Sequence, residues 1–340
     1  MLCKGKPYRR FFLLFCDILR NKTIFIAPLD WGFGHATRCV PLIKQLMENN
    51  VIILGITPTT GLIFNEEFPE LKKINIEPYN ISYSKWLPLS VKLILEASRI
   101  LGVIKKEHEQ LKSIIKKHKI DVVISDNRFG LYHKDVECIY ITHQLNLQAG
   151  IFSSLATKIH EHYICKFNQV WIPDFENDKA SLAGSLSRNK SSGNVTYLGP
   201  LSRLNADGAA KEQFDYICLL SGPEPLRSEL ESLLIEKARK SSLKICLVRG
   251  SHKTLGNIPQ NITVYHMPMA KELGQLIQCS RTVICRSGYS TLMDLHHLHK
   301  KNVILIPTPG QSEQVYLAEY WLQKFGARII QQKELKDFSF

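Results

Sequence analysis

The sequence has no apolar run long enough to cross a membrane, and it lacks the short motifs that mark several common enzyme sites. A bilayer-spanning helix needs about 20 apolar residues, and no stretch of the 340 residues approaches that length. There is no GxxxxGK[ST] phosphate loop, no GxSxG turn, no HExxH motif and no Asp-x-Asp pair. These absences argue against a P-loop nucleotidase, an α/β-hydrolase and a zincin, and we expect neither a metal site nor a bound cofactor.

A regular cysteine framework is also missing. The nine cysteines form no CxxC pair, and Cys218, Cys246 and Cys285 lie inside apolar segments, where a free thiol acts as a small hydrophobe. This usage predicts a reducing compartment and a cytoplasmic protein. The apolar run 11–16 is too short to span a bilayer and has no cleavage site after it, so residues 1–22 are interpreted as an N-terminal extension.

Charge of one sign is in excess, since 44 Lys and Arg oppose 31 Asp and Glu for a net charge of +13. The lysines are scattered, and their densest group lies at 105–119, on a predicted helix whose apolar positions face inward. A solvated helix face is the simpler interpretation. A peripheral contact with the inner face of a membrane stays open as an alternative. Without an aromatic RNA-binding motif or zinc-finger spacing, we expect no nucleic-acid partner.

Short β-branched runs alternate with longer helical patterns along the chain, which predicts parallel sheets with crossover helices. A polar, glycine-bearing linker follows 195–198 and precedes a new apolar strand at 215–220. We therefore predict an α/β protein with two Rossmann-like, doubly wound domains facing across a cleft. The first domain is expected over 23–204 and the second over 205–340.

In the second half, a small polar corner follows a buried strand and opens a helix. Its members are Arg286, Ser287, Gly288, Ser290 and Thr291. A helix N-terminus presents free N–H groups and a positive dipole end, so such a corner suits the diphosphate of a nucleotide. Asp294 lies one turn into the helix, where it could meet a ribose diol. A second polar corner, Thr308–Gln314, follows the next strand.

In the first half, the first strand leads into Gly32, Gly34 and His35 before a helix predicted over 37–49. Two glycines permit a tight turn, and a histidine there can act as a general base near neutral pH. The fourth strand ends at Asp126, which could orient His35, accept a substrate proton or pair with Arg128. The fifth strand ends in another polar turn, 142–144. The alternative for His35 is a hydrogen bond that only holds its loop.

The runs 283–294 and 307–318 resemble the C-terminal domain of the MurG-type glycosyltransferases, which are GT-B enzymes that use UDP-GlcNAc. The resemblance implies that Ser287–Thr291 contact the donor diphosphate and that Asp294 takes the place of a ribose-binding glutamate. It also implies that Glu313 and Gln314 replace a Gln-Gln pair that reads the sugar hydroxyls. The glutamate in that pair departs from the family pattern, which leaves the identity of the donor sugar open. The corner 126–128 also departs from it, which disfavours peptidoglycan synthesis.

These features together predict an inverting, metal-independent glycosyltransferase. His35, oriented by Asp126, would deprotonate a hydroxyl of a lipid, polysaccharide or other acceptor, which attacks a UDP-sugar, GlcNAc being the first choice. Loop N–H groups, the helix dipole and Arg286 would stabilise the departing UDP. The alternatives are a UDP-sugar epimerase or hydrolase and a non-catalytic nucleotide-sugar-binding subunit.

Overall fold

A computed structural model describes residues 19–80, 91–92, 95–147, 153–188, 194–205 and 211–340. Most of the predicted N-terminal extension and part of the predicted linker lie outside these residues. The chain divides into two compact units, with the division between Leu201 and Ser202. No helix in the described ranges combines the length and the apolar content of a membrane span.

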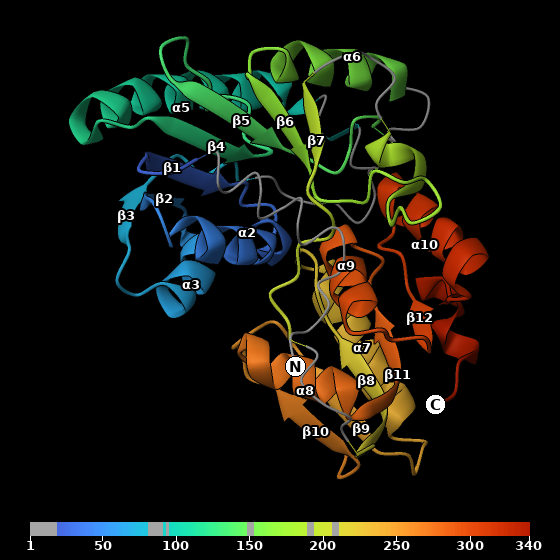
Figure 1. The fold of residues 1–340 in the computed structure, drawn as a ribbon. Helices are drawn as coiled ribbons and strands as arrows, with labels where there is room; N and C mark the ends of the chain where they lie inside the picture. Colours follow the sequence, from blue (N-terminus) through green and yellow to red (C-terminus); the bar gives the residue numbers. More distant parts are fainter. Residues whose placement is uncertain (1–18, 81–90, 93–94, 148–152, 189–193, 206–210) are drawn as a thin grey trace, which may run out of the picture. The chain divides into compact units, whose positions relative to one another are not determined.

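The first unit is built on a seven-stranded parallel sheet (Figure 1). The strand order is β3-β2-β1-β4-β5-β6-β7. Its members are β1 (Thr23–Pro28), β2 (Val51–Ile56), β3 (Lys72–Asn75), β4 (Val122–Asp126), β5 (Glu137–Ile141), β6 (Gln169–Ile172) and β7 (Val195–Tyr197). The order reverses between β1 and β4, so the carboxyl ends of these two neighbours form the topological switch point.

Helices cover both faces of this sheet. Ile24 and Ile26 of β1 pack on one face beneath α2 (Phe33–Leu46) and α3 (Pro58–Glu67). Phe25 and Ala27 pack on the other face, which α5 (Ala97–His118) and α6 (Ser153–Ile164) cover. Burial on both faces explains why the strands read as continuous apolar runs. The short 3₁₀ segment η2 (Gly184–Ser187) follows β6.

The second unit has a six-stranded parallel sheet of order β10-β9-β8-β11-β12-β13. Its strands are β8 (Phe214–Leu219), β9 (Ile245–Val248), β10 (Ile262–Tyr265), β11 (Ser280–Cys285), β12 (Val303–Leu305) and β13 (Arg328–Ile329). The helical elements are α7 (Leu226–Ala238), α8 (Ala270–Gln278), α9 (Tyr289–His297), α10 (Ser312–Phe325) and η3 (Gln332–Asp337). Here the order reverses between β8 and β11, which are direct neighbours.

The α/β class and the doubly wound topology are therefore confirmed, and three local predictions need correction. The first helix begins at Phe33 rather than at residue 37. The apolar run 74–79 predicts a strand over those residues, whereas β3 spans Lys72–Asn75. The sequence reading also missed α3, whose start is fixed by Thr57 and Thr60 in a reciprocal capping arrangement with Pro58 in the first turn.

Candidate functional site

The turn between β1 and α2 places His35 at the switch point of the first sheet. Gly32 has φ +82°, a left-handed conformation that strongly favours glycine. Helix α2 begins at the next residue with no side-chain cap, so His35 belongs to its first turn. The earlier helix start therefore holds His35 on a regular element, where the sequence pattern had left it in the preceding loop.

Asp126 at the end of β4 is the centre of a buried hydrogen-bonded cluster. Its Oδ1 lies 2.7 Å from His35 Nδ1, and its Oδ2 accepts a bond from Arg38 Nε at 2.5 Å. Arg38 Nη2 also bonds Asp126 Oδ1. His35 and Arg38 are three residues apart on α2, so both reach the same carboxylate from one helix face. Asp126 is fully buried and His35 is 14% exposed.

These neighbours determine the charges in the cluster. Burial alone would raise the pKa of Asp126, but Arg38 and His35 outweigh it and hold that pKa well below its usual range. Burial and Arg38 lower the pKa of His35, while Asp126 opposes the shift. At neutral pH the cluster therefore contains an anionic Asp126 and a neutral His35.

A neutral His35 beside a carboxylate has the arrangement of a general base. Nδ1 of His35 lies 2.7 Å from Asp126 Oδ1 and 2.9 Å from Arg38 Nη2, which itself donates to Asp126 Oδ1. A carboxylate oxygen only accepts, so we assign the proton of His35 to Nδ1, which donates along the shorter contact to Asp126. Nε2 then holds the lone pair, and no hydrogen bond to another described residue occupies it. This is the geometry in which an acid orients an imidazole for proton abstraction.

His143, after β5, joins the cluster through Arg38. Nη1 of Arg38 lies 3.1 Å from His143 Nδ1, and Nε2 of His143 lies 3.3 Å from Nε2 of Gln144. Since a guanidinium only donates, Nδ1 of His143 accepts the hydrogen bond from Arg38. The third polar corner of the first unit thus meets the other two, as the sequence predicted from strand order.

Arg128 does not pair with Asp126, contrary to one of the sequence-based options. Its Nε bonds Glu107 of α5, and its guanidinium carbon lies 4.9 Å from the centre of the Tyr79 ring. Glu107 also accepts from the Tyr79 hydroxyl at 3.0 Å and from the Gly130 N–H at 2.9 Å. This buried group stabilises the loop that follows Asp126.

The sequence-based predictions did not include Arg38 or Glu107, although the sequence carried a signal for each. Arg38 stands three residues after His35, which is the spacing of helical neighbours. Glu107 interrupts the apolar stripe of α5, formed with Val103, Ile104 and Leu111, and an acid in such a stripe is buried with a partner.

In the second unit, α9 begins at the switch point of its sheet. Gly288 is the N-cap residue, and no side chain caps the helix. A Cβ added to Gly288 would meet nothing within 4 Å, so there is open space next to the first turn, which contains Ser290 and Thr291. The predicted anion corner is thus a helix start with room beside it. Ser287 is buried and donates its hydroxyl to the Gln314 carbonyl at 2.7 Å.

Arg286 is buried inside this edge of the sheet. Its two terminal nitrogens bond the carbonyls of Ile306, Pro307 and Leu226 and the side-chain oxygen of Gln332. Burial lowers the pKa of Arg286 to about 10. The guanidinium therefore ties β12, the start of α7 and the C-terminal segment together beneath the corner.

Asp294 lies in α9 and accepts a hydrogen bond from the Ser202 hydroxyl at 2.5 Å. Burial raises its pKa to about 6, against the opposing influence of Ser202 and Arg203. Near neutral pH this carboxyl is therefore poised between its two protonation states, and it is bound to the segment that opens the second unit.

The two residues expected to read the sugar have different environments. Glu313 is half-buried in the first turn of α10. Gln314 is 8% exposed, and its Oε1 accepts from the Thr308 N–H at 2.9 Å while its Nε2 donates to Gln311 at 2.6 Å. Gln314 thus fixes the loop between β12 and α10 from inside.

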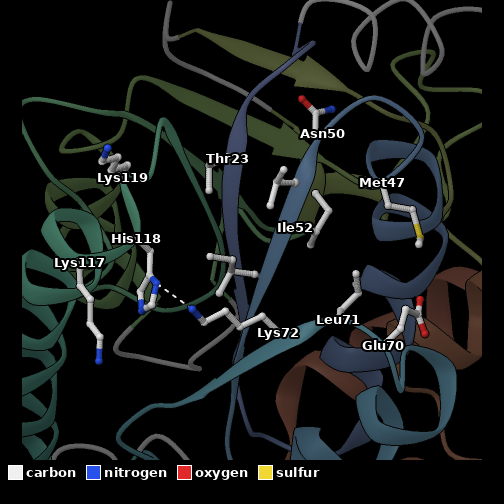
Figure 2. A pocket seen from close by; sticks show the side chains of 12 residues that line it. Thr23, Met47, Asn50, Ile52, Glu70, Leu71, Lys72, Lys117, His118 and Lys119 are labelled. Carbon is white, nitrogen blue, oxygen red and sulfur yellow. Dashed lines mark hydrogen bonds between the residues drawn. The ribbon is translucent and has the colours of Figure 1, made fainter.

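A cavity of about 590 Å³ lies elsewhere in the first unit (Figure 2). Its lining includes Thr23, Val51 and Lys72, the first residues of β1, β2 and β3. His118 points toward Lys72, 3.1 Å away, and partial burial and the nearby lysines lower the pKa of His118. Because the sheet is parallel, this basic cavity is at the edge opposite to His35 and Asp126.

Comparison with known proteins defines the class. Residues 227–339 match the model of the glycosyltransferase family 28 C-terminal domain. The spinosyn rhamnosyltransferase SpnG is similar in structure, with a TM-score of 0.65 and 14% identity over 94% of this chain and 90% of that one. MurG of Acinetobacter baumannii gives a TM-score of 0.54 and 14% identity over 92% and 86%. CalG4, the calicheamicin glycosyltransferase, gives a TM-score of 0.62 and 12% identity over 93% of this chain and 87% of that one.

The protein has the GT-B fold, with two Rossmann-like units. Residues 227–339 of its second unit match the C-terminal domain of glycosyltransferase family 28, which confirms the resemblance drawn from the runs 283–294 and 307–318. No curated protein sequence matches the chain. SpnG has also been solved with thymidine diphosphate and with spinosyn aglycone.

Proposed function

We propose that the protein transfers a sugar, GlcNAc in the first instance, from a UDP-sugar to a hydroxyl of a glycan or lipid acceptor. Nε2 of His35 removes the proton of the acceptor hydroxyl, and Asp126 holds the imidazole in the required tautomer. The oxygen forms a bond to the anomeric carbon as the bond from that carbon to the diphosphate breaks. UDP leaves with the electron pair, and the anomeric configuration is inverted.

The observation that carries this proposal is the His35–Asp126 pair at the switch point of the first sheet. The bond of 2.7 Å, the anionic state of Asp126 and the neutral state of His35 meet the requirements of a general base. Arg38 and Asp126 form a buried pair that fixes the carboxylate in position.

The second unit supplies the donor contacts in this proposal. The first turn of α9, with Gly288, Ser290 and Thr291, meets the diphosphate through N–H groups and the helix dipole, so that no metal ion is required. Asp294 contacts the ribose, and Glu313 contacts the sugar. Arg286 and Ser287 support the corner from beneath, in keeping with their buried hydrogen bonds.

We further propose a cytoplasmic location. Seven cysteines in the described residues are free, and burial raises the pKa of Cys218, Cys246 and Cys285. Such protonated, buried thiols suit a reducing compartment. A lipid acceptor would bring the protein to the inner membrane face, and the basic face of α5 would then meet anionic lipid.

The test is UDP release from UDP-GlcNAc, measured with and without a pool of glycan and lipid acceptors. We expect acceptor-dependent release by the wild type, a loss of about 10²–10⁴-fold in His35→Ala, and unchanged UDP binding in that variant. Full turnover by His35→Ala would remove His35 from its role. Release or isomerisation without acceptor would favour a hydrolase or epimerase, and UDP binding without any product would favour a binding subunit.

A further inference from the structure

Thr308, at the end of β12, has a buried hydroxyl without a hydrogen-bond partner among the described residues. The residue is 1% exposed, and Oγ1 is the atom left unsatisfied. Burying a hydroxyl in this way is unfavourable, and valine would fill the same space without the cost. The polar group therefore calls for an explanation outside the packing of the unliganded protein.

The backbone of Thr308 is held firmly, which fixes the position of this hydroxyl. The N–H donates to Gln314 Oε1 at 2.9 Å, and the carbonyl accepts from the Gln311 N–H at 3.1 Å. Both backbone groups are thus satisfied within the loop 308–314. Only the hydroxyl is left for a partner from outside this loop.

The turn after β8 faces the Thr308 hydroxyl. A Cβ added to Gly222 would lie 4.0 Å from Oγ1 and would meet no other atom within that distance. Gly222 has φ +98°, a conformation that other residues adopt with difficulty. The turn therefore brings bare backbone opposite the hydroxyl.

Strand order places both loops beside the start of α9. Strand β11, which leads into α9, lies between β8 and β12 in the sheet. The loop after β11 also touches the start of α10, because Ser287 donates to the Gln314 carbonyl. Three loops thus converge on one corner at the carboxyl edge, where a parallel sheet binds its ligand.

We propose that the Thr308 hydroxyl donates a hydrogen bond to the diphosphate of the nucleotide sugar, a contact that rests on the proposed donor site. A phosphate oxygen is an anionic acceptor, and hydrogen bonds to charged groups are the strong ones. The hydroxyl is covered in the unliganded state, so the ligand reaches it through a small shift of the Gly222 turn. Gln314 acts as a positioning residue that holds Thr308 for this contact.

The test compares Thr308→Val and Thr308→Ser with the wild type by calorimetric titration with UDP, UDP-GlcNAc and UMP. We expect Thr308→Val to lower the affinity for UDP and UDP-GlcNAc by about tenfold or more and to leave the affinity for UMP unchanged. Thr308→Ser should retain the wild-type affinity for all three nucleotides. Without ligand, Thr308→Val should raise the melting temperature by about 2 °C, because it removes an unsatisfied group.

Thr60→Val is the matched control, because Thr60 is a buried threonine whose hydroxyl is already bonded to Thr57. It should lower the melting temperature and leave UDP affinity unchanged. Unchanged UDP affinity in Thr308→Val, or an equal loss for UMP and UDP, overturns the inference. A wild type that binds none of the three nucleotides overturns the proposed function itself, and the Thr308 contact with it.

Discussion

The surroundings of two carboxylates of this protein shift their pKa values in opposite directions. Asp126 faces the guanidinium of Arg38 and stays ionised far below neutral pH. Asp294 accepts a hydrogen bond from the Ser202 hydroxyl, and burial raises its pKa to about 6. The same side chain is thereby a permanent anion in one unit and a titrating group in the other.

Asp126→Asn tests the role of the anion. The neutral amide cannot balance the positive charge of Arg38 or favour the His35 tautomer with the proton on Nδ1. We therefore expect turnover to fall by about 10²–10⁴-fold. Loss of the negative charge also lowers the pKa of His35, so the acid limb of the remaining rate profile should move to lower pH. The rate profile from pH 5 to 8 measures both effects. Asp135→Asn, at an exposed position, is the control, and a wild-type profile in Asp126→Asn would contradict the assignment.

Asp294→Asn should change how stability depends on pH. A carboxyl whose pKa rises from 3.8 to about 6 on folding favours the folded state below pH 4. That contribution is lost as the pH rises through 6 and amounts to about 3 kcal/mol at most. Asp294→Asn should therefore be more stable than the wild type at pH 7.5 and equal to it near pH 4. Urea unfolding at both pH values measures this, with Asp178→Asn, at an exposed position, as the control. If Asp294→Asn and the wild type differ in unfolding free energy by the same amount at both pH values, the prediction is wrong.

At the scale of elements, two helix starts use glycine for different reasons. Gly32 precedes α2 with φ +82°, whereas Gly288 precedes α9 with φ −72° in an ordinary extended conformation. Backbone strain thus requires glycine at the first start only. At the second, the glycine leaves open space next to the proposed diphosphate contact.

Gly32→Ala and Gly288→Ala form a matched pair. We expect Gly32→Ala to cost about 1–2 kcal/mol of unfolding free energy, because it places a side chain at positive φ. Gly288→Ala should leave stability unchanged and weaken UDP binding, because its methyl group enters the space next to α9. Urea unfolding and UDP titration separate the two effects. An unchanged UDP affinity in Gly288→Ala would show that the open space has no bearing on the ligand.

The pair Glu107–Arg128 offers a test of how α5 supports the catalytic corner. Glu107→Gln leaves Arg128 buried without its anion and should cost about 3–5 kcal/mol of unfolding free energy. Glu109→Gln, on the exposed side of the same helix, should leave the unfolding free energy nearly unchanged. Denaturant unfolding measures both. Similar costs for the two variants would mean that the buried pair is not a support of the corner.

The sequence predicted the elements that have a strong local signal. Apolar runs such as 169–172 and 262–265 became strands with the predicted bounds. His35 and Asp126 were placed together from strand order alone, and the structure joins them at 2.7 Å. Helix α3 was not predicted, because its apolar residues show little amphipathic spacing and its start depends on a capping arrangement.

The side-chain partners could not be predicted in the same way. The sequence offered Arg128 as a partner of Asp126, but Arg128 bonds Glu107, which arrives from α5, and Arg38 pairs with Asp126 instead. The buried hydrogen bonds of Arg286 likewise come from β12, α7 and the C-terminal segment. Such contacts join residues far apart in the chain and follow from packing.

At the scale of the whole molecule, each unit places its polar residues at the switch point of its own sheet. The first does so with His35 and Asp126 after β1 and β4, and the second with the loops after β8 and β11. In the proposed function, two units of one topology separate two tasks, the base chemistry in the first and the donor contacts in the second.

The most direct measurement is a thermal-unfolding series of the wild type with UDP-GlcNAc, other UDP-sugars, TDP-sugars and UMP. A ligand at 100 times its dissociation constant stabilises the native state by about 2.7 kcal/mol. We predict that UDP-GlcNAc raises the melting temperature by several degrees and that Gly288→Ala abolishes most of this increase. If no nucleotide sugar raises the melting temperature, or if Gly288→Ala responds like the wild type, the donor site is not at the start of α9.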